Sequence, residues 1–205
     1  MTEEWQKLTA EQTAKLLVEI NPSLVPVSFN PDSTTIRSQK LPFYKDYLFL
    51  ELTDLSTVPG AKKYVLYKAG KNPDVNVINW TNQAIYDTNE KAPVILNEDT
   101  VVSYAKFFFG YVRGRHGRFL IIETIDDVRW QIEPPAQGRK VMQEMLSPVG
   151  LESVGADGVF VLSAFMVFKD SLFKTRIHVR ADGIVSMTDE DLKIEGMPVL
   201  TDTAA

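Results

Sequence analysis

The sequence lacks cysteine altogether and has only two histidines among its 205 residues. Without cysteine there can be no disulfide, no thiolate nucleophile and no metal site that needs a thiolate ligand. His116 and His178 lie far apart, and neither belongs to an HExxH-type spacing. The sequence therefore predicts no catalytic metal site, and no motif in it points to a cofactor.

Long apolar runs are also absent. No uninterrupted run approaches the roughly 18–20 apolar residues that a transmembrane helix needs. The first seven residues contain two glutamates and one lysine, and they lack the basic and apolar regions of a secretory signal. We therefore expect a cytoplasmic protein that does not associate with membranes.

Acidic residues outnumber basic ones, 27 against 22, which gives a formal net charge of -5 at pH 7. Nucleic-acid binders need a broad basic face to neutralise phosphates, so this balance argues against DNA or RNA as a partner. Hydrophobic residues make up 44% of the chain and charged residues 24%, as in ordinary globular proteins. Because no linker is long or flexible enough to separate two halves, we expect residues 1–205 to form a single compact domain.

Local signals near the N-terminus predict a helix and then an irregular connector. Thr9 and Gln12 have the spacing of a capping box, in which each side chain accepts a hydrogen bond from the other residue's backbone N–H. Apolar residues follow at helical spacing, and Pro22 ends the pattern. Residues 22–42 contain four prolines. We expect this segment to be irregular, apart from one short edge strand near 25–29.

Strand patterns occur in both halves of the chain. Segments 47–52, 63–68 and 75–80 are rich in apolar, β-branched and aromatic residues, and Thr81-Asn82 predicts a hairpin into a further strand. A second set of such segments, at 158–168, 172–180 and 184–188, predicts three antiparallel strands, with Asp182-Gly183 as a hairpin turn. Alternation in the middle strand places four basic side chains on one face: Lys174, Arg176, His178 and Arg180. That face could bind an acidic partner; the alternative is an ordinary solvated outer face.

The most distinctive pattern is an aromatic-rich helix at 97–113, followed by a basic turn and a strand at 118–123. Asn97 is a good helix cap. Apolar residues then recur at helical spacing and predict a buried stripe of Val101, Tyr104, Ala105, Phe108 and Val112. Further aromatic residues widen the stripe, so we expect most of this helix to be covered.

These patterns predict an α+β fold, in which antiparallel β-meanders pack with the central helix at 97–113 and a shorter N-terminal helix. Residues 43–96 and 139–200 contain similar orders of strands, turns and acidic residues. Two related halves around helix 97–113 would explain the similarity; chance in a β-rich chain is the alternative.

The basic turn supplies the candidate ligand-binding residues, which lie in a stretch without acidic residues at 101–122: Arg113, Arg115, His116 and Arg118. The guanidinium groups could converge on a phosphate or carboxylate, with the histidine making binding pH-dependent. Alternatively, these cations neutralise the C-terminus of a helix, and the neighbouring glycines are needed only for the turn. The turn lacks the consensus of a phosphate-binding loop.

No catalytic signature is present, and nothing in the sequence argues for an enzyme. There is no Gly-x-Ser-x-Gly elbow, and the acidic clusters do not match a calcium-loop spacing. Our leading hypothesis is a binding or adaptor module that engages a protein partner. The alternative is a small-molecule enzyme or sensor for an anionic ligand that uses the basic turn 113–118. The oligomeric state has no signature in the sequence.

Overall fold

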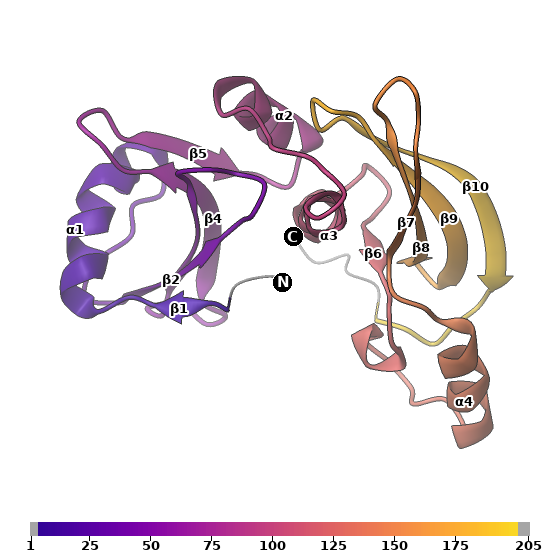
Figure 1. The fold of residues 1–205 in the computed structure, drawn as a ribbon. Coiled ribbons are helices and arrows are strands. Elements are labelled where there is room, and N and C mark those ends of the chain that lie inside the picture. Colours follow the sequence, from indigo (N-terminus) through magenta and orange to yellow (C-terminus); the bar gives the residue numbers. More distant parts are fainter. Residues whose placement is uncertain (1–3, 201–205) are drawn as a thin grey trace. The chain divides into compact units, whose positions relative to one another are not determined.

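The structure is a computed structural model that describes residues 4–200, which form an α+β fold with two antiparallel sheets and four α-helices (Figure 1). The predicted fold class is therefore confirmed. The chain divides into two compact units, Met1–Ile95 and Leu96–Ala205. Each unit has its own sheet and its own hydrophobic cluster. We describe the two units separately, and the single domain expected over residues 1–205 stays a prediction.

The sheet of the N-terminal unit is an antiparallel meander of five strands in chain order: β1 (Gln6–Lys7), β2 (Thr34–Lys40), β3 (Leu48–Asp54), β4 (Ala61–Lys68) and β5 (Asp74–Ile78). Helix α1 (Ala10–Ile20) packs along this curved sheet, and the short helix η1 (Asn21–Ser23) follows it (Figure 1). The unit also contains α2 (Asn82–Lys91).

The start of α1 is the predicted capping box. The Gln12 N–H donates to Thr9 Oγ1 at 3.2 Å, and the Thr9 N–H donates to Gln12 Oε1 at 2.9 Å. Leu17 and Ile20 are buried on the helix face toward the sheet. Together with apolar side chains of the sheet they form one hydrophobic cluster, which includes Ile36, Leu50, Leu52 and Val65.

The strand expected near 25–29 is wrong: these residues form a turn and irregular backbone, and the strand β2 lies farther along the connector. Every residue of β2 has a partner in β3, from Thr34 opposite Asp54 to Lys40 opposite Leu48. The buried side chains of β2 recur at every second position, Thr34, Ile36 and Ser38. Two of these three are polar, which is why the period of a half-buried strand is hard to see in the sequence.

The hairpin expected at Thr81-Asn82 is also wrong, because these residues begin helix α2. Thr81 is the N-cap, and its Oγ1 accepts a hydrogen bond of 3.3 Å from the Ala84 N–H. A threonine at this position satisfies one of the free N–H groups in the first turn of a helix. The same residue type that favours turns therefore starts a helix here.

The C-terminal unit has a second antiparallel sheet. Its strands are β6 (Phe119–Ile121), β7 (Gly150–Val154), β8 (Phe160–Phe168), β9 (Ser171–Val179) and β10 (Val185–Ile194). The long strands β8, β9 and β10 lie side by side, as the sequence predicts (Figure 1). The predicted turn at Gly183 is confirmed, with φ of 82° and a hydrogen bond of 2.8 Å from its N–H to the Arg180 carbonyl. Strands β6 and β7 both pair with β8, on the edge opposite β9.

The aromatic-rich helix is α3 (Val101–Tyr111), shorter at both ends than predicted. Asn97 shapes the turn before the helix, because its Oδ1 accepts hydrogen bonds of 3.0 Å from the N–H groups of Asp99 and Thr100. Most of the helix is covered, as expected, and its buried residues are Val101, Tyr104, Ala105, Phe107, Phe108 and Phe109. The Tyr104 hydroxyl donates a hydrogen bond of 2.7 Å to the Gly183 carbonyl, which ties α3 to the β9–β10 turn.

The remaining helices of this unit are η2 (Ile125–Asp127) and α4 (Ala136–Met145), which packs through Met142. None of the helices in residues 4–200 has the length and apolarity that crossing a bilayer would require. The two segments compared in the sequence, 43–96 and 139–200, each contain an antiparallel hairpin, β4–β5 and β8–β9. They then differ, since α2 follows the first hairpin and β10 the second. A duplication stays a prediction.

Candidate functional site

The predicted basic site is a tight turn between α3 and β6. Gly114 and Gly117 pair with each other: the Gly114 N–H donates to the Gly117 carbonyl at 2.9 Å, and the Gly117 N–H donates back at 3.2 Å. Arg115 and His116 occupy the two-residue tip and are exposed. Arg113, just before the turn, is half-buried.

Arg118 has a structural position at the end of α3. Its Nε donates a hydrogen bond of 3.3 Å to the Phe109 carbonyl, and its Nη2 donates to the Gly110 carbonyl. The last carbonyls of a helix have no partner within the helix, and a cation there is favourable. These contacts support the helix-end interpretation for Arg118. An anion site that uses Arg113, Arg115, His116 and Arg118 together stays a prediction.

Two of the four basic side chains on the outer face of β9 form ion pairs with neighbouring residues. Arg176 forms ion pairs with Glu152 at 2.7 Å and with Asp189 at 3.0 Å. Arg180 pairs with Asp182 at 2.7 Å. An outer sheet face of paired charges is what the solvated-surface alternative predicts.

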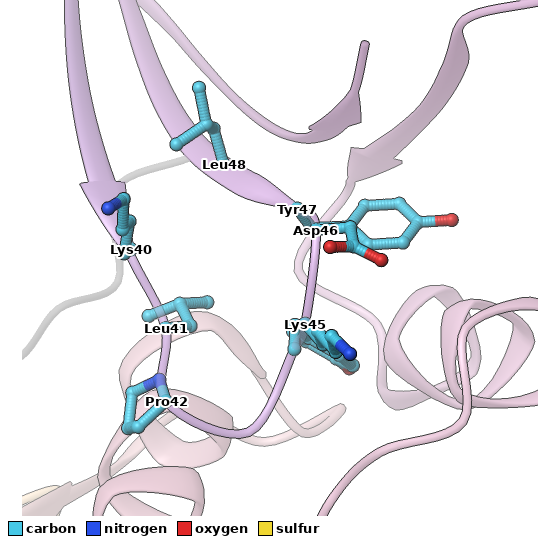
Figure 2. Close-up of a pocket in the computed structure, with 8 residues that line it drawn as sticks. Lys40, Leu41, Pro42, Lys45, Asp46, Tyr47 and Leu48 are labelled. Atoms are coloured by element: carbon cyan, nitrogen blue, oxygen red, sulfur yellow. The ribbon is translucent and has the colours of Figure 1, made fainter. Parts of the chain in front are cut away.

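A different place in the molecule combines an apolar hollow with cations. A hollow of about 460 Å³ lies in the N-terminal unit, in the segment that joins β2 to β3. Its lining residues are Lys40, Leu41, Pro42, Tyr44, Lys45, Asp46, Tyr47 and Leu48. In Figure 2, Lys40, Leu41 and Pro42 lie on one side of the hollow and Lys45, Asp46 and Tyr47 on the other.

Two tyrosines fix the shape of this segment. The Tyr44 hydroxyl donates a hydrogen bond of 2.5 Å to Asn89 Oδ1 of α2, and the Tyr47 hydroxyl donates one of 2.5 Å to Asp74 Oδ2 of β5. Both tyrosines are buried, and the ring of Tyr47 points away from Lys40 (Figure 2). Both hydroxyls bind neighbouring elements of the same unit, so these hydrogen bonds fix the positions of Tyr44 and Tyr47 in the segment.

The charges around the hollow are unevenly paired. Lys40 and Lys45 are exposed and form no ion pair with any residue from 4 to 200. Asp46 lies 3.9 Å from Lys68 Nζ, so a neighbouring cation already balances its carboxylate. The lining thus carries two lysines and one aspartate, a small excess of positive charge in a protein that is acidic as a whole.

A second exposed feature of the N-terminal unit is the turn between β3 and β4. Leu55 is 62% exposed and Val58 is 99% exposed. The turn is nevertheless hydrogen-bonded internally: Thr57 Oγ1 donates to the Pro59 carbonyl at 3.1 Å and accepts from the Ala61 N–H at 3.1 Å. It is an ordered tip that presents apolar side chains to solvent.

Sequence reasoning missed the hollow because its residues belong to no motif. Residues 40–42 belong to the predicted irregular connector and residues 47–48 to a predicted strand, whereas 43–46 match neither pattern. The two lysines have no spacing that points to a ligand. The one available signal was the mixture of lysine and tyrosine between two strands. Within residues 4–200, no group of three or more His, Asp or Glu side chains is placed to hold a metal ion.

Comparison with protein-family models, curated proteins and solved structures found no match, so function is inferred from the residues of this chain.

Proposed function

We propose that this protein is a binding module that takes a small molecule into the hollow formed by residues 40–48. The observation that carries the proposal is the coincidence of apolar surface and unpaired lysines in one hollow of about 460 Å³. Small-molecule sites typically have volumes of roughly 300–1,000 Å³ and combine apolar walls with a few polar groups. We assign binding, and no reaction, to this hollow.

The rigidity of the segment also supports binding. Leu41, Phe43, Tyr44 and Tyr47 are buried and anchor it at four points. A loop that is already ordered loses little conformational entropy when a ligand arrives, so more of the contact energy appears as affinity. The register of β2 and β3, in which Lys40 lies opposite Leu48, fixes the two ends of the segment.

A fragment titration monitored by backbone amide NMR shifts tests this proposal. A mixed library of charged and neutral fragments should include members that shift the amides of residues 40–48. Leu48→Trp, which fills the hollow, should weaken those fragments by about tenfold or more. Leu192→Trp, at an exposed leucine on β10, controls for an added tryptophan outside the hollow, and thermal unfolding of Leu48→Trp checks that the half-buried position tolerates the change. Shifts confined to other residues, or equal affinity in Leu48→Trp, would refute the proposal.

The tip between β3 and β4 supports a second candidate function, the engagement of a protein partner. A fully exposed valine on an ordered turn gains roughly 1.5–3 kcal/mol if a partner buries it. A photo-crosslinking residue at position 58 should then capture one partner under native conditions, whereas one at position 71 should not. Capture that persists after Leu55→Ser in the same chain would argue against the tip as an anchor.

A further inference from the structure

We infer that the hollow at residues 40–48 takes an uncharged ligand that is mainly hydrocarbon, of the class of medium-length aliphatic alcohols. The inference rests on the proposed small-molecule function and names the class of ligand. It follows from the directions of the side chains around the hollow, which turn hydrocarbon toward the space and charge away from it (Figure 2).

The charged side chains of the lining do not face the space between the two sides of the hollow. The ammonium groups of Lys40 and Lys45 are directed away from it, and both lysines are exposed (Figure 2). The carboxylate of Asp46 lies 3.9 Å from Lys68 Nζ, and the same Nζ lies over the Tyr47 ring, 5.7 Å from its centroid. Asp46 thus points toward Lys68, on the side where the Tyr47 ring lies and away from Lys40 (Figure 2). Water solvates these charges, so they do not direct a charged ligand into the space.

The hydroxyl groups of the lining are engaged outside the hollow. Tyr44 donates to Asn89 Oδ1 and Tyr47 donates to Asp74 Oδ2, each at 2.5 Å. Neither hydroxyl is left to donate to a ligand. An ionised group that entered the hollow would also lose hydration without gaining a counterion, and this loss costs free energy. Both effects disfavour strongly polar and charged ligands.

Hydrocarbon faces the space instead. Leu41 extends from its side of the hollow toward the opposite side (Figure 2). Leu48, the first residue of β3, lies at the end of the hollow nearest the sheet, and Pro42 adds further hydrocarbon to the lining. Each methylene that a ligand buries against such a surface multiplies its affinity by up to about fourfold. Affinity should therefore rise with chain length until the hollow of about 460 Å³ is filled.

Calorimetric titrations, with NMR amide shifts to locate binding, test the ligand class with two sets of probes. The first set varies chain length: 1-butanol, 1-hexanol and 1-octanol should bind with rising affinity, by up to about fourfold per methylene. The second set varies charge at constant length: hexyl phosphate and hexylammonium should bind residues 40–48 no more tightly than 1-hexanol at low salt. Because ions do not screen an uncharged ligand, the affinity of 1-hexanol should change by less than about twofold between low and moderate salt.

Variants of the apolar lining locate the contact surface. Leu41→Ser should weaken the binding of 1-hexanol by about fivefold or more, because the alkyl chain loses a leucine that it contacts. Val58→Ser is the matched control, since Val58 is an exposed apolar residue of the same unit outside the hollow. Leu41 is buried, so thermal unfolding of Leu41→Ser must show that the variant folds. Leu48→Ser, at a half-buried position, makes the same test independently.

The outcomes separate this inference from the proposed function. If hexyl phosphate or hexylammonium shifts residues 40–48 at lower concentrations than 1-hexanol does, the uncharged class is wrong and the small-molecule function stands. The same conclusion follows if affinity does not rise from 1-butanol to 1-hexanol. If no probe and no library fragment shifts residues 40–48, both fail. If 1-hexanol binds Leu41→Ser and Leu48→Ser as tightly as the unchanged protein, the apolar lining is not the contact surface and the inference is overturned.

Discussion

The Tyr47 hydroxyl donates a hydrogen bond of 2.5 Å to the Asp74 carboxylate, and this contact joins the segment that lines the hollow to strand β5. Burial, together with the hydrogen bond to Asp74 and its negative charge, raises the pKa of Tyr47 to about 12. Burial alone would raise the pKa of Asp74, but the hydrogen bond from Tyr47 and the nearby charge of Lys91 lower it overall. At neutral pH the phenol is therefore protonated and the carboxylate ionised, the combination that the contact needs.

Tyr47→Phe should lower the free energy of unfolding by about 1.5–3 kcal/mol at pH 7, as expected for a hydrogen bond to a charged group. The pKa of Tyr47 is higher in the folded protein than in the unfolded chain. Its contribution to stability is thus fully present below about pH 10 and is lost as the pH rises toward about 12. Urea unfolding from pH 8 to 12 should show a smaller loss of stability in the variant. Parallel pH profiles for the two proteins would rule out this linkage.

Gly117 and Gly138 should respond in opposite ways to replacement by alanine. Gly117 has φ of 136°, and a Cβ there would lie 3.2 Å from the Phe168 ring. Gly138 lies within helix α4, and a Cβ there would meet no atom within 4 Å. We expect Gly117→Ala to destabilise the protein by about 1–2 kcal/mol and Gly138→Ala to stabilise it by about 0.5–1 kcal/mol. Thermal unfolding of both variants would check the signs, and a gain in stability for Gly117→Ala would contradict the prediction.

The parts of the fold that could be predicted are those in which local chemistry and tertiary structure agree. The stripe of α3 buries Val101, Tyr104, Ala105 and Phe108 as predicted, whereas Val112 lies beyond the end of the helix and is half-buried. In β9 the alternation is confirmed for Thr175, Ile177 and Val179, and it shifts at the start of the strand, where Leu172 is buried in place of Phe173. Strand β2 escaped prediction because it buries two hydroxyl side chains, Thr34 and Ser38, beside a single isoleucine. The strand conformation of β2 depends on its pairing with β3, and the residue pattern of β2 alone does not reveal this pairing.

The capping box of α1 allows a direct test of a signal visible in the sequence. Thr9→Ala removes the Oγ1 that accepts from the Gln12 N–H, and should lower stability by about 0.5–2 kcal/mol. Thr9→Ser keeps the acceptor and should lose far less. Chemical denaturation of the two variants makes the comparison, which isolates the hydrogen bond from other effects of the substitution. Equal losses in both variants would mean that the threonine methyl group, rather than the cap, matters.

The candidate hollow could not be predicted for a related reason. Its shape depends on the end of β2, on Asp46 with φ of 67°, and on hydrogen bonds from Tyr44 and Tyr47 to distant elements. None of these is a property of neighbouring residues in the sequence. The basic turn, by contrast, is conspicuous in the sequence because its cations are consecutive or nearly so. The closeness of these cations in the sequence does not distinguish a cation that faces a ligand from one that binds the end of a helix.

Arg118 and Arg115 separate these two roles for the basic turn. Arg118→Gln removes the guanidinium that donates to the Phe109 and Gly110 carbonyls, and should lower the free energy of unfolding by about 1–2 kcal/mol. Arg115→Gln, at the exposed tip, should change it by less than about 0.5 kcal/mol. Urea unfolding at low and moderate salt measures both. If Arg118→Gln leaves stability unchanged but abolishes the binding of hexyl phosphate, Arg118 serves a ligand and the helix-end role is wrong. A stability loss without any change in anion binding would instead confine Arg118 to the end of α3.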